Sequence, residues 1–315
     1  MNLSFKSKGV PWCLGAALIA TVAGCGGGGG NSGSTVTNPN PTSSGEIVFA
    51  IQAAVPFRPT SDQLFTVNLD GSNLTSVPVT TIRASGVEWF PGRREFVYTD
   101  SFLNGGFDTI VRTNREGTNN RIIASTFGVS QASVSPDGRR IAHVQSIVGT
   151  APIFIGAADD VTKRTELVAG IYPSWSSDGK RIVYSAHAAD STEGSFDIYS
   201  INVDGTGKKR LTNSGAFNAE AQFSPDGKRI VYTSTRLKAP PFPVIFTVNE
   251  DGNNSKRLTK IQGGDFNPRW TLDGSRIVFL SAQSGITRFN VMNADGSNQK
   301  LLLNTNLNIS NFDLR

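Results

Sequence analysis

The chain has 315 residues, of which 38% are hydrophobic and 17% are charged, and this balance favours a folded domain over a disordered chain. The net charge of +5 falls to +3 when Lys6 and Lys8, which lie in a leader segment, are set aside. A charge this small, without a basic stripe interleaved with aromatic residues, excludes nucleic acid as the expected partner. Much of the glycine, 33 residues in all, falls in turns or in one run, which is typical of an all-β protein.

Residues 1–24 have the order of a secretory signal peptide. Lys6 and Lys8 form a positively charged start, and residues 10–22 form an apolar segment too short to span a bilayer comfortably. Small residues then lead to Cys25, and the sequence VAGC resembles the bacterial lipobox. This resemblance implies that Cys25 is lipidated and becomes the new N-terminus, whereas the alternative is an ordinary signal peptide with an incidental cysteine.

Residues 25–45 are rich in Gly, Ser, Asn and Pro and have almost no apolar side chains, so we expect a flexible tether. A tether fits between a lipid anchor in the membrane and a folded domain at 46–315. Gly26 follows the cysteine in place of Asp, which by the lipobox resemblance favours the outer membrane. The only cysteines are Cys13 and Cys25, so the domain is expected to have no disulfide, no Cys-ligated metal and no Cys nucleophile.

A hairpin sequence recurs along the domain. It reads VSPDGRRIAHVQS from Val134, WSSDGKRIVYSAH from Trp175, FSPDGKRIVYTST from Phe223 and WTLDGSRIVFLSA from Trp270. A second turn signal of the form Asn-x-Asp-Gly falls between these copies, and no segment has helical periodicity. Each unit of 40–50 residues therefore contains four short antiparallel strands, which is the pattern of a β-propeller blade.

The repeats predict six blades, of which one is divided between the two ends of the chain. An altered copy, WFPGRREFVYT, begins at Trp89, and the residues from Ile47 match a second strand that has no first strand before it. Residues 308–314 match a first strand with nothing after it. We therefore expect the last strand to pair with the first and to close the ring, which removes free sheet edges.

The repeat SPDGKRIVYTS, followed by DIYSINVDGTGKKRLT ending at Thr212, resembles the TolB-like β-propeller repeat, which is related to WD-type repeats. The resemblance covers about residues 46–315 and implies a six-bladed propeller. TolB proper has an N-terminal α/β domain, and the tether stands in its place here. The Tol-Pal role is therefore not expected from the resemblance alone.

Little in the sequence points to catalysis. The repeated Asp137, Asp178, Asp226 and Asp273 each precede a Gly and are predicted to shape hairpin turns rather than to act as catalytic carboxylates. His143 lies in a predicted strand, and His187 begins a loop with Asp190 and Glu193, where a metal site is the less favoured alternative. Metal-dependent lyases of the polygalacturonate type share such propellers but use several histidines. We therefore expect no cofactor, no metal and no enzymatic activity, although a Ser-His-Asp triad is not excluded.

Partner-binding residues are predicted at the channel and on the rim opposite the tight turns, since loops held by a rigid ring usually carry binding. The inner strands have a polar residue one place before each core aromatic residue or valine, and a variable residue three places before it. The first set is expected to line the channel and the second to ring its mouth, with Arg236 in a loop beside them. The resulting candidates are Glu88, Tyr172, Glu220, Gln222, Arg236, Asn267 and Arg269.

These features favour a monomeric, lipid-anchored scaffold of the cell envelope that binds a protein or peptide. It would be held at the outer membrane and face either the periplasm or the cell surface. A carbohydrate-active or other hydrolytic or lyase enzyme is the second hypothesis, and a lipoprotein that binds glycan or peptidoglycan is the third. Fold alone does not choose among them.

Overall fold

The computed structural model describes residues 45–51, 64–79, 84–92, 94–104, 107–146, 151–188, 190, 194–235, 242–260, 263–303 and 308–315. All of them belong to the unit that runs from Pro39 to Arg315. The proposed signal peptide, Cys25, Glu193 and Arg236 lie outside the described residues, as does the tether apart from Gly45. The described residues include no helix capable of crossing a membrane.

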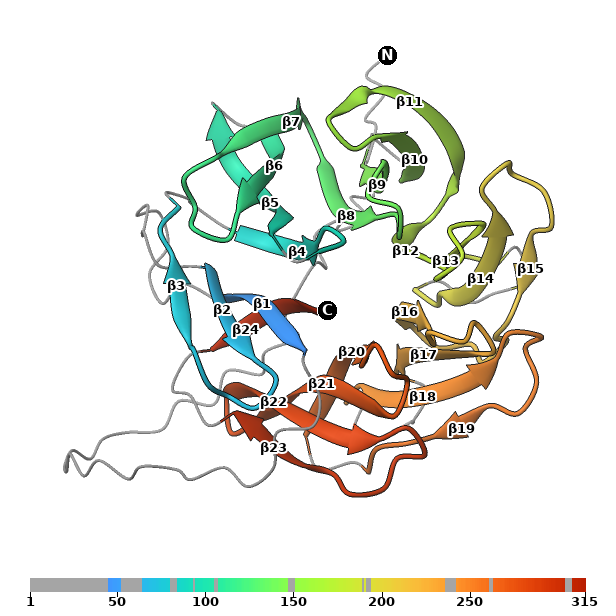
Figure 1. Ribbon diagram of the computed structural model, residues 1–315. Helices are drawn as coiled ribbons and strands as arrows, with labels where there is room; N and C mark the ends of the chain where they lie inside the picture. Colours follow the sequence, from blue (N-terminus) through green and yellow to red (C-terminus); the bar gives the residue numbers. More distant parts are fainter. Residues whose placement is uncertain are drawn as a thin grey trace, which may run out of the picture. The chain divides into compact units, whose positions relative to one another are not determined.

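The described strands form six antiparallel sheets of four, arranged as the blades of a β-propeller (Figure 1), so the predicted fold class is confirmed. From the channel outward, blade 1 consists of β24 (Ile309–Leu314), β1 (Glu46–Ile51), β2 (Leu64–Asn68) and β3 (Thr75–Val77), and blade 2 of β4 (Ala84–Trp89), β5 (Glu95–Asn104), β6 (Phe107–Asn114) and β7 (Arg121–Thr126). Blade 3 consists of β8 (Val129–Val134), β9 (Arg140–Gln145), β10 (Pro152–Ala157) and β11 (Asp160–Ala169), and blade 4 of β12 (Ile171–Trp175), β13 (Arg181–Ala186), β14 (Asp197–Asn202) and β15 (Lys209–Arg210). Blade 5 consists of β16 (Asn218–Phe223), β17 (Arg229–Ser234), β18 (Val244–Asn249) and β19 (Lys256–Arg257), and blade 6 of β20 (Gly264–Trp270), β21 (Arg276–Gln283), β22 (Ile286–Asn293) and β23 (Lys300–Leu303).

The second strand of each blade is apolar on both faces because each face packs against a different blade. In β17, Ile230 and Tyr232 belong to the core shared with blade 4, whereas Val231 belongs to the core shared with blade 6. Side chains alternate between the faces of a strand, so an uninterrupted apolar run fills two cores. The repeated Ile-Val-Tyr run is therefore a consequence of the ring.

Blade 1 closes the ring with strands from both ends of the domain, as predicted. β24 pairs with β1 so that Phe312 lies opposite Phe49. Phe289 of blade 6 packs edge-on against both rings, with centroid distances of 5.3 Å to Phe49 and 5.0 Å to Phe312. Figure 1 shows the C-terminal end of β24 at the centre of the ring.

The carboxylate of each repeated aspartate accepts hydrogen bonds from groups within its own turn. The hydroxyl of Ser224 donates to Asp226 Oδ1 at 2.5 Å, and the backbone N–H of Lys228 donates to the same oxygen at 3.1 Å. Equivalent side-chain hydrogen bonds form at Asp137, Asp178 and Asp273, and each lowers the pKa of its carboxyl group. These hairpin turns and the Asn-x-Asp-Gly turns lie at one end of the blades, here called the turn rim, and the opposite end is the loop rim.

The arginine at the start of the second strand contacts an aromatic ring of the next blade. The guanidinium carbons of Arg140 and Arg229 lie 4.7 Å from the ring centroids of Trp175 and Trp270, respectively. A cation over an aromatic face contributes roughly 0.5–2 kcal/mol, depending on how far the pair is desolvated. The repeated Arg-Ile pair at the start of the second strand thus encodes both a strand and a contact between blades.

Blade 3 departs from the repeat in its core. Its second strand carries His143, where the other blades have an aromatic residue (Phe49, Tyr98, Tyr184, Tyr232 and Phe279). The imidazole is fully buried and stacks on Phe154 at a centroid distance of 5.8 Å. Burial, and next the positive charge of Arg164, lower the pKa of His143 from 6.5 to about 4. The predicted strand position of His143 is confirmed, and its imidazole is part of the packing.

Replacing His143 by Phe should reduce the loss of stability on mild acidification. The folded-state pKa lies below the unfolded value, so protons bind the unfolded chain first and stability falls as the pH drops from about 6.5 towards 4. Between pH 7.5 and 5.0, this linkage costs the wild type about 2 kcal/mol, which His143→Phe should not lose. Urea unfolding at both pH values tests the difference, with His187→Phe, at an exposed position, as the control. Equal pH dependence in wild type and His143→Phe would contradict this account.

Candidate functional site

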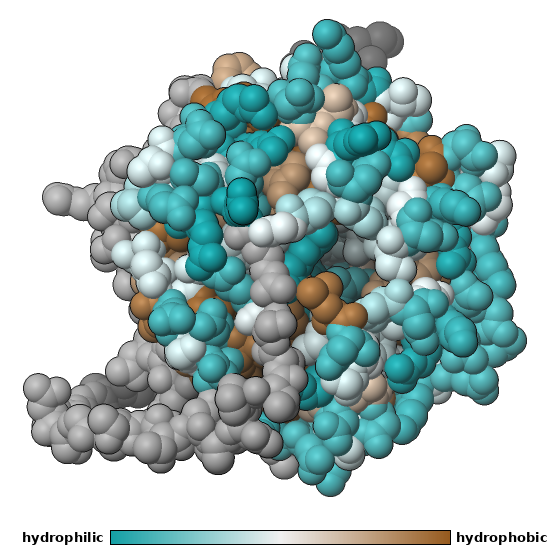
Figure 2. Space-filling view, viewed as in Figure 1, coloured by the Kyte–Doolittle hydropathy of each residue, from teal (hydrophilic) through white to brown (hydrophobic). Residues whose placement is uncertain are grey.

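Six of the seven predicted binding residues lie on inner strands around the channel, and Arg236 lies outside the described residues. They are Glu88 on β4, Tyr172 on β12, Glu220 and Gln222 on β16, and Asn267 and Arg269 on β20. The face of the ring in Figure 2 is largely hydrophilic and is hollowed near its centre. The six residues divide into two groups, one nearer the loop rim and one nearer the turn rim.

A β-bulge at the loop-rim end of five inner strands shapes the channel mouth. In β16 the pairing with β17 shifts between Ala219 and Gln222, and Glu220 has a φ of +55°. The same left-handed backbone recurs at the equivalent residues Gly86, Gln131, Tyr172 and Asn267. A left-handed conformation costs a residue other than glycine roughly 1–2 kcal/mol, and such strain concentrates at functional sites. This bulge is not evident from the sequence.

Side chains at the bulges reach across to the next blade. Gln131 Oε1 accepts a hydrogen bond from the backbone N–H of Tyr172 at 2.6 Å. Glu220 Oε2 accepts from the backbone N–H of Asn267 at 2.7 Å and from the Thr233 hydroxyl at 2.7 Å. Burial, and next the charge of Glu220, raise the pKa of the Tyr172 phenol. Three predicted residues from three blades, namely Tyr172, Glu220 and Asn267, therefore meet at the mouth.

Asn267 has the least satisfied side chain of this group. The residue is only 2% exposed, yet neither its Oδ1 nor its Nδ2 has a hydrogen-bond partner among the described residues. A buried amide without partners costs roughly 1–3 kcal/mol, so this unsatisfied donor and acceptor beside the channel mouth mark a candidate contact for a ligand.

The residues nearer the turn rim hold neighbouring inner strands together. Gln222 Oε1 accepts from the backbone N–H of Trp270 at 2.8 Å, and Glu88 Oε1 accepts from the backbone N–H of Val134 at 2.9 Å. Asp313 Oδ2 accepts from the backbone N–H of Trp89 at 3.0 Å. These bonds satisfy donors on the free edges of β20, β8 and β4. The channel-lining residues thus also connect the blades.

A charged cluster lies in this second group. Arg315 Nη2 is 3.6 Å from Glu88 Oε1, and Arg269 Nε is 3.8 Å from Asp313 Oδ1. Burial and the nearby Asp313 raise the pKa of Glu88 to about 7, although both arginines oppose the shift. Asp313 and Arg315 were not among the predicted residues, because they follow the core position instead of preceding it.

Aromatic side chains gather on the loop rim. Phe196 lies 3.9 Å from the His187 ring centroid and 5.3 Å from that of Phe217. Phe127, 67% exposed, and Phe107, 49% exposed, adjoin the last cross-strand pair of β6 and β7. His187 therefore packs within an aromatic group, and no three His, Cys, Asp or Glu side chains among the described residues form a metal-binding group.

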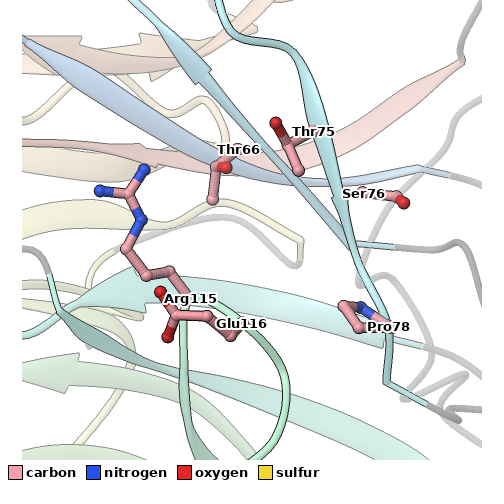
Figure 3. Close-up of a pocket in the computed structure, with 6 residues that line it drawn as sticks. All are labelled: Thr66, Thr75, Ser76, Pro78, Arg115 and Glu116. Atoms are coloured by element: carbon pink, nitrogen blue, oxygen red, sulfur yellow. The ribbon is translucent and has the colours of Figure 1, made fainter.

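A separate groove of about 480 Å³ lies at the turn rim between blades 1 and 2 (Figure 3). It is lined by residues of the outer strands and of a turn, namely Thr66, Thr75, Ser76, Pro78, Arg115 and Glu116. The guanidinium of Arg115 is paired with Glu46 across the blade boundary. The groove therefore does not include the predicted channel residues.

The chain is similar to known β-propeller proteins. The family described as "TolB beta propeller domain" matches residues 129–311. The Tol-Pal system protein TolB of Francisella tularensis subsp. mediasiatica (strain FSC147) is 46% identical over 59 residues, which are 18% of this chain and only 12% of that protein.

Two solved structures show the same fold. The structure of TolB from Acinetobacter baumannii has a TM-score of 0.71 at 20% identity and covers 86% of this chain and 66% of that one. An oligogalacturonate lyase in complex with manganese has a TM-score of 0.54 at 14% identity and covers 77% of this chain and 71% of that one. At such identities, the likeness concerns the fold.

Replacing Glu220 by Ala should destabilise the domain, whereas Glu220→Gln should be nearly neutral. The alanine variant removes the acceptor of the Thr233 hydroxyl and leaves the Asn267 N–H only its longer bond to Thr233 Oγ1 at 3.2 Å, at a cost of roughly 1–3 kcal/mol. Glutamine keeps an acceptor oxygen at the same reach. Urea unfolding at neutral pH measures both variants. Equal stability of the two variants would show that the hydrogen bonds to Glu220 contribute nothing to the free energy of unfolding.

Proposed function

Because the chain belongs to the TolB β-propeller domain family, we propose that it is a non-enzymatic envelope scaffold that binds a protein or peptide segment at the channel mouth and loop rim. The observation that carries this proposal is the buried amide of Asn267, which has no partner in the part of the chain that the structure describes and lies within a ring of left-handed residues. An enforced left-handed backbone holds that amide in place before any ligand arrives, which reduces the entropic cost of binding.

The chemistry of the mouth suits an extended peptide. The Asn267 side chain offers one acceptor and one donor group, which match the N–H and C=O of a peptide bond. Glu220 and the Tyr172 phenol add an acceptor and a polar aromatic surface beside it. Exposed Phe107 and Phe127 supply the kind of anchors that carry much of the energy of protein interfaces. A glycan without N-acetyl groups offers hydroxyl groups but no amide pair, so the peptide is the preferred ligand.

We further propose that Cys25 anchors the protein in the outer membrane. In this proposal, residues 1–24 are the signal peptide, 25–45 the tether and 46–315 a monomeric propeller. Several acyl chains are needed for stable attachment, because a single chain gives only marginal binding. The name of the Francisella relative places that protein in the Tol-Pal system. The relation supports an envelope partner, whose identity the crosslinking below is designed to find.

Replacing Asn267 by Ala should weaken capture of the partner at least about fivefold, as expected for an anchor worth more than about 1 kcal/mol. A photo-crosslinking residue at Phe127, on the loop rim, would report capture in intact cells. Asn298→Ala is the matched control, since Asn298 also has a left-handed backbone but lies on the turn rim. An unchanged yield in Asn267→Ala, or an equal fall in Asn298→Ala, would refute the mouth as the site. Capture of a glycan in place of a protein would favour the glycan-binding alternative.

Replacing Cys25 by Ser should abolish incorporation of labelled palmitate into the protein. The physical reason is that the thiol is the acceptor of the lipid and serine does not replace it. Cys13→Ser is the control, because Cys13 lies inside the proposed signal peptide. Persistent labelling of Cys25→Ser, or loss of labelling only in Cys13→Ser, would disprove the proposed anchor.

A further inference from the structure

The charged cluster near the turn rim has guanidinium donors that its carboxylates leave open. Its three N–O separations are 3.6 Å for Arg315–Glu88 and 3.8 Å each for Arg315–Asp313 and Arg269–Asp313. The ion pairs Arg210–Asp197 and Arg181–Glu250, by contrast, close to 2.6 and 2.9 Å. Charge-assisted hydrogen bonds of this type normally have lengths of about 2.7–2.9 Å. The arginines in the channel are therefore ion-paired with the carboxylates at longer range, without hydrogen bonds to them.

The carboxylates cannot move closer without breaking bonds between blades. Glu88 is held by the Val134 N–H and by the Ser133 hydroxyl at 3.0 Å, and Asp313 is held by the Trp89 N–H. The only hydrogen bond from the Arg269 guanidinium to a described residue goes to the carbonyl of Pro268, and the Arg315 guanidinium donates none to these residues. Each guanidinium has five N–H donors, so most of them remain open.

We propose that this cluster is a carboxylate-binding site, in which an acidic side chain or a free monocarboxylate enters the channel and occupies the open donors of Arg269 and Arg315. A planar carboxylate matches the two-pronged geometry of a guanidinium. The adjacent Glu88 and Asp313 disfavour a multiply charged ligand such as phosphate, because like charges repel at this range. The site lies beyond the channel mouth and does not depend on the function proposed for the mouth.

Glu88 sets the pH at which the site is available. Asp313 of β24, Arg315 directly after β24 and Arg269 of β20 are the charged groups that act on Glu88. The Ser133 hydroxyl of β8 donates a hydrogen bond to it, and Val97 of β5 lies opposite Glu88 in the sheet. The cluster is neutral when both acids are charged and gains one positive charge when Glu88 is protonated. A pKa of about 7 for Glu88 places this change near neutral pH. Acidification through neutrality should therefore strengthen the binding of an anion.

Calorimetry on the full chain in detergent micelles tests the site at pH 6.0 and 8.0. The probes are propionate, a blocked peptide with one internal aspartate, and the same peptide with asparagine. If only the protonated form of Glu88 admits the ligand, its population falls from about 0.9 to 0.1 between these pH values. The aspartate peptide should then bind about tenfold more tightly at pH 6.0, and the asparagine peptide should not bind. Binding of propionate as well would support a free carboxylate as ligand, and binding of the aspartate peptide alone would support an acidic segment.

Three variants make the test decisive. Glu88→Gln keeps an acceptor for the Val134 N–H but lacks the charge, so it should bind tightly at both pH values. Arg315→Gln should lose binding, whereas Arg139→Gln, an exposed turn-rim residue outside the cluster, should not. Thermal unfolding checks each fold, and Arg269→Gln replaces Arg315→Gln if the latter unfolds. Absence of binding by both carboxylates, an unchanged pH ratio in Glu88→Gln, or full binding by the arginine variant would overturn the proposal.

Discussion

The innermost strand of each blade has an unpaired backbone edge that faces the channel, and the rest of the structure depends on how that edge is satisfied. A free strand edge exposes N–H and C=O groups that require partners. Here side chains of one blade supply acceptors to the next, from Glu88 to Val134, from Gln222 to Trp270 and from Asp313 to Trp89. A single blade has neither these acceptors nor a cover for its two apolar faces, so the stable unit is the closed ring.

The same constraint explains why the channel is polar. Side chains that accept backbone hydrogen bonds must carry oxygen atoms, and they must stand beside the axis where the inner strands meet. These polar side chains differ between the two ends of the channel. The bulges hold Asn267 and Glu220 at the mouth, while Arg269, Arg315, Glu88 and Asp313 collect nearer the turn rim. Structural bonding and ligand recognition thus use the same shell of residues.

Local and periodic features were readable from the sequence because each is encoded within one repeat. The Pro-Asp-Gly turn at Asp226, the apolar run from Ile230 and the split blade all followed from spacing and residue type. The alternation rule also placed Glu88 and Arg269 at the channel. It did not reveal the bulge at Glu220, since a left-handed Glu has no sequence signature comparable to that of glycine. Nor did it reveal that the His143 imidazole is fully buried and stacks on Phe154.

The sequence by itself determined the strand order, the six-fold repeat and the closure of the ring, because these depend on local turn chemistry and on period-two patterning. Only the tertiary structure decided which polar residues meet. Arg269, Glu88 and Arg315 come from three inner strands far apart in the chain, and their distances depend on how blades 1, 2 and 6 pack around the axis. The shift in the pKa of Glu88 and the isolation of the Asn267 amide arise from burial and neighbouring groups, which exist only once the ring has closed.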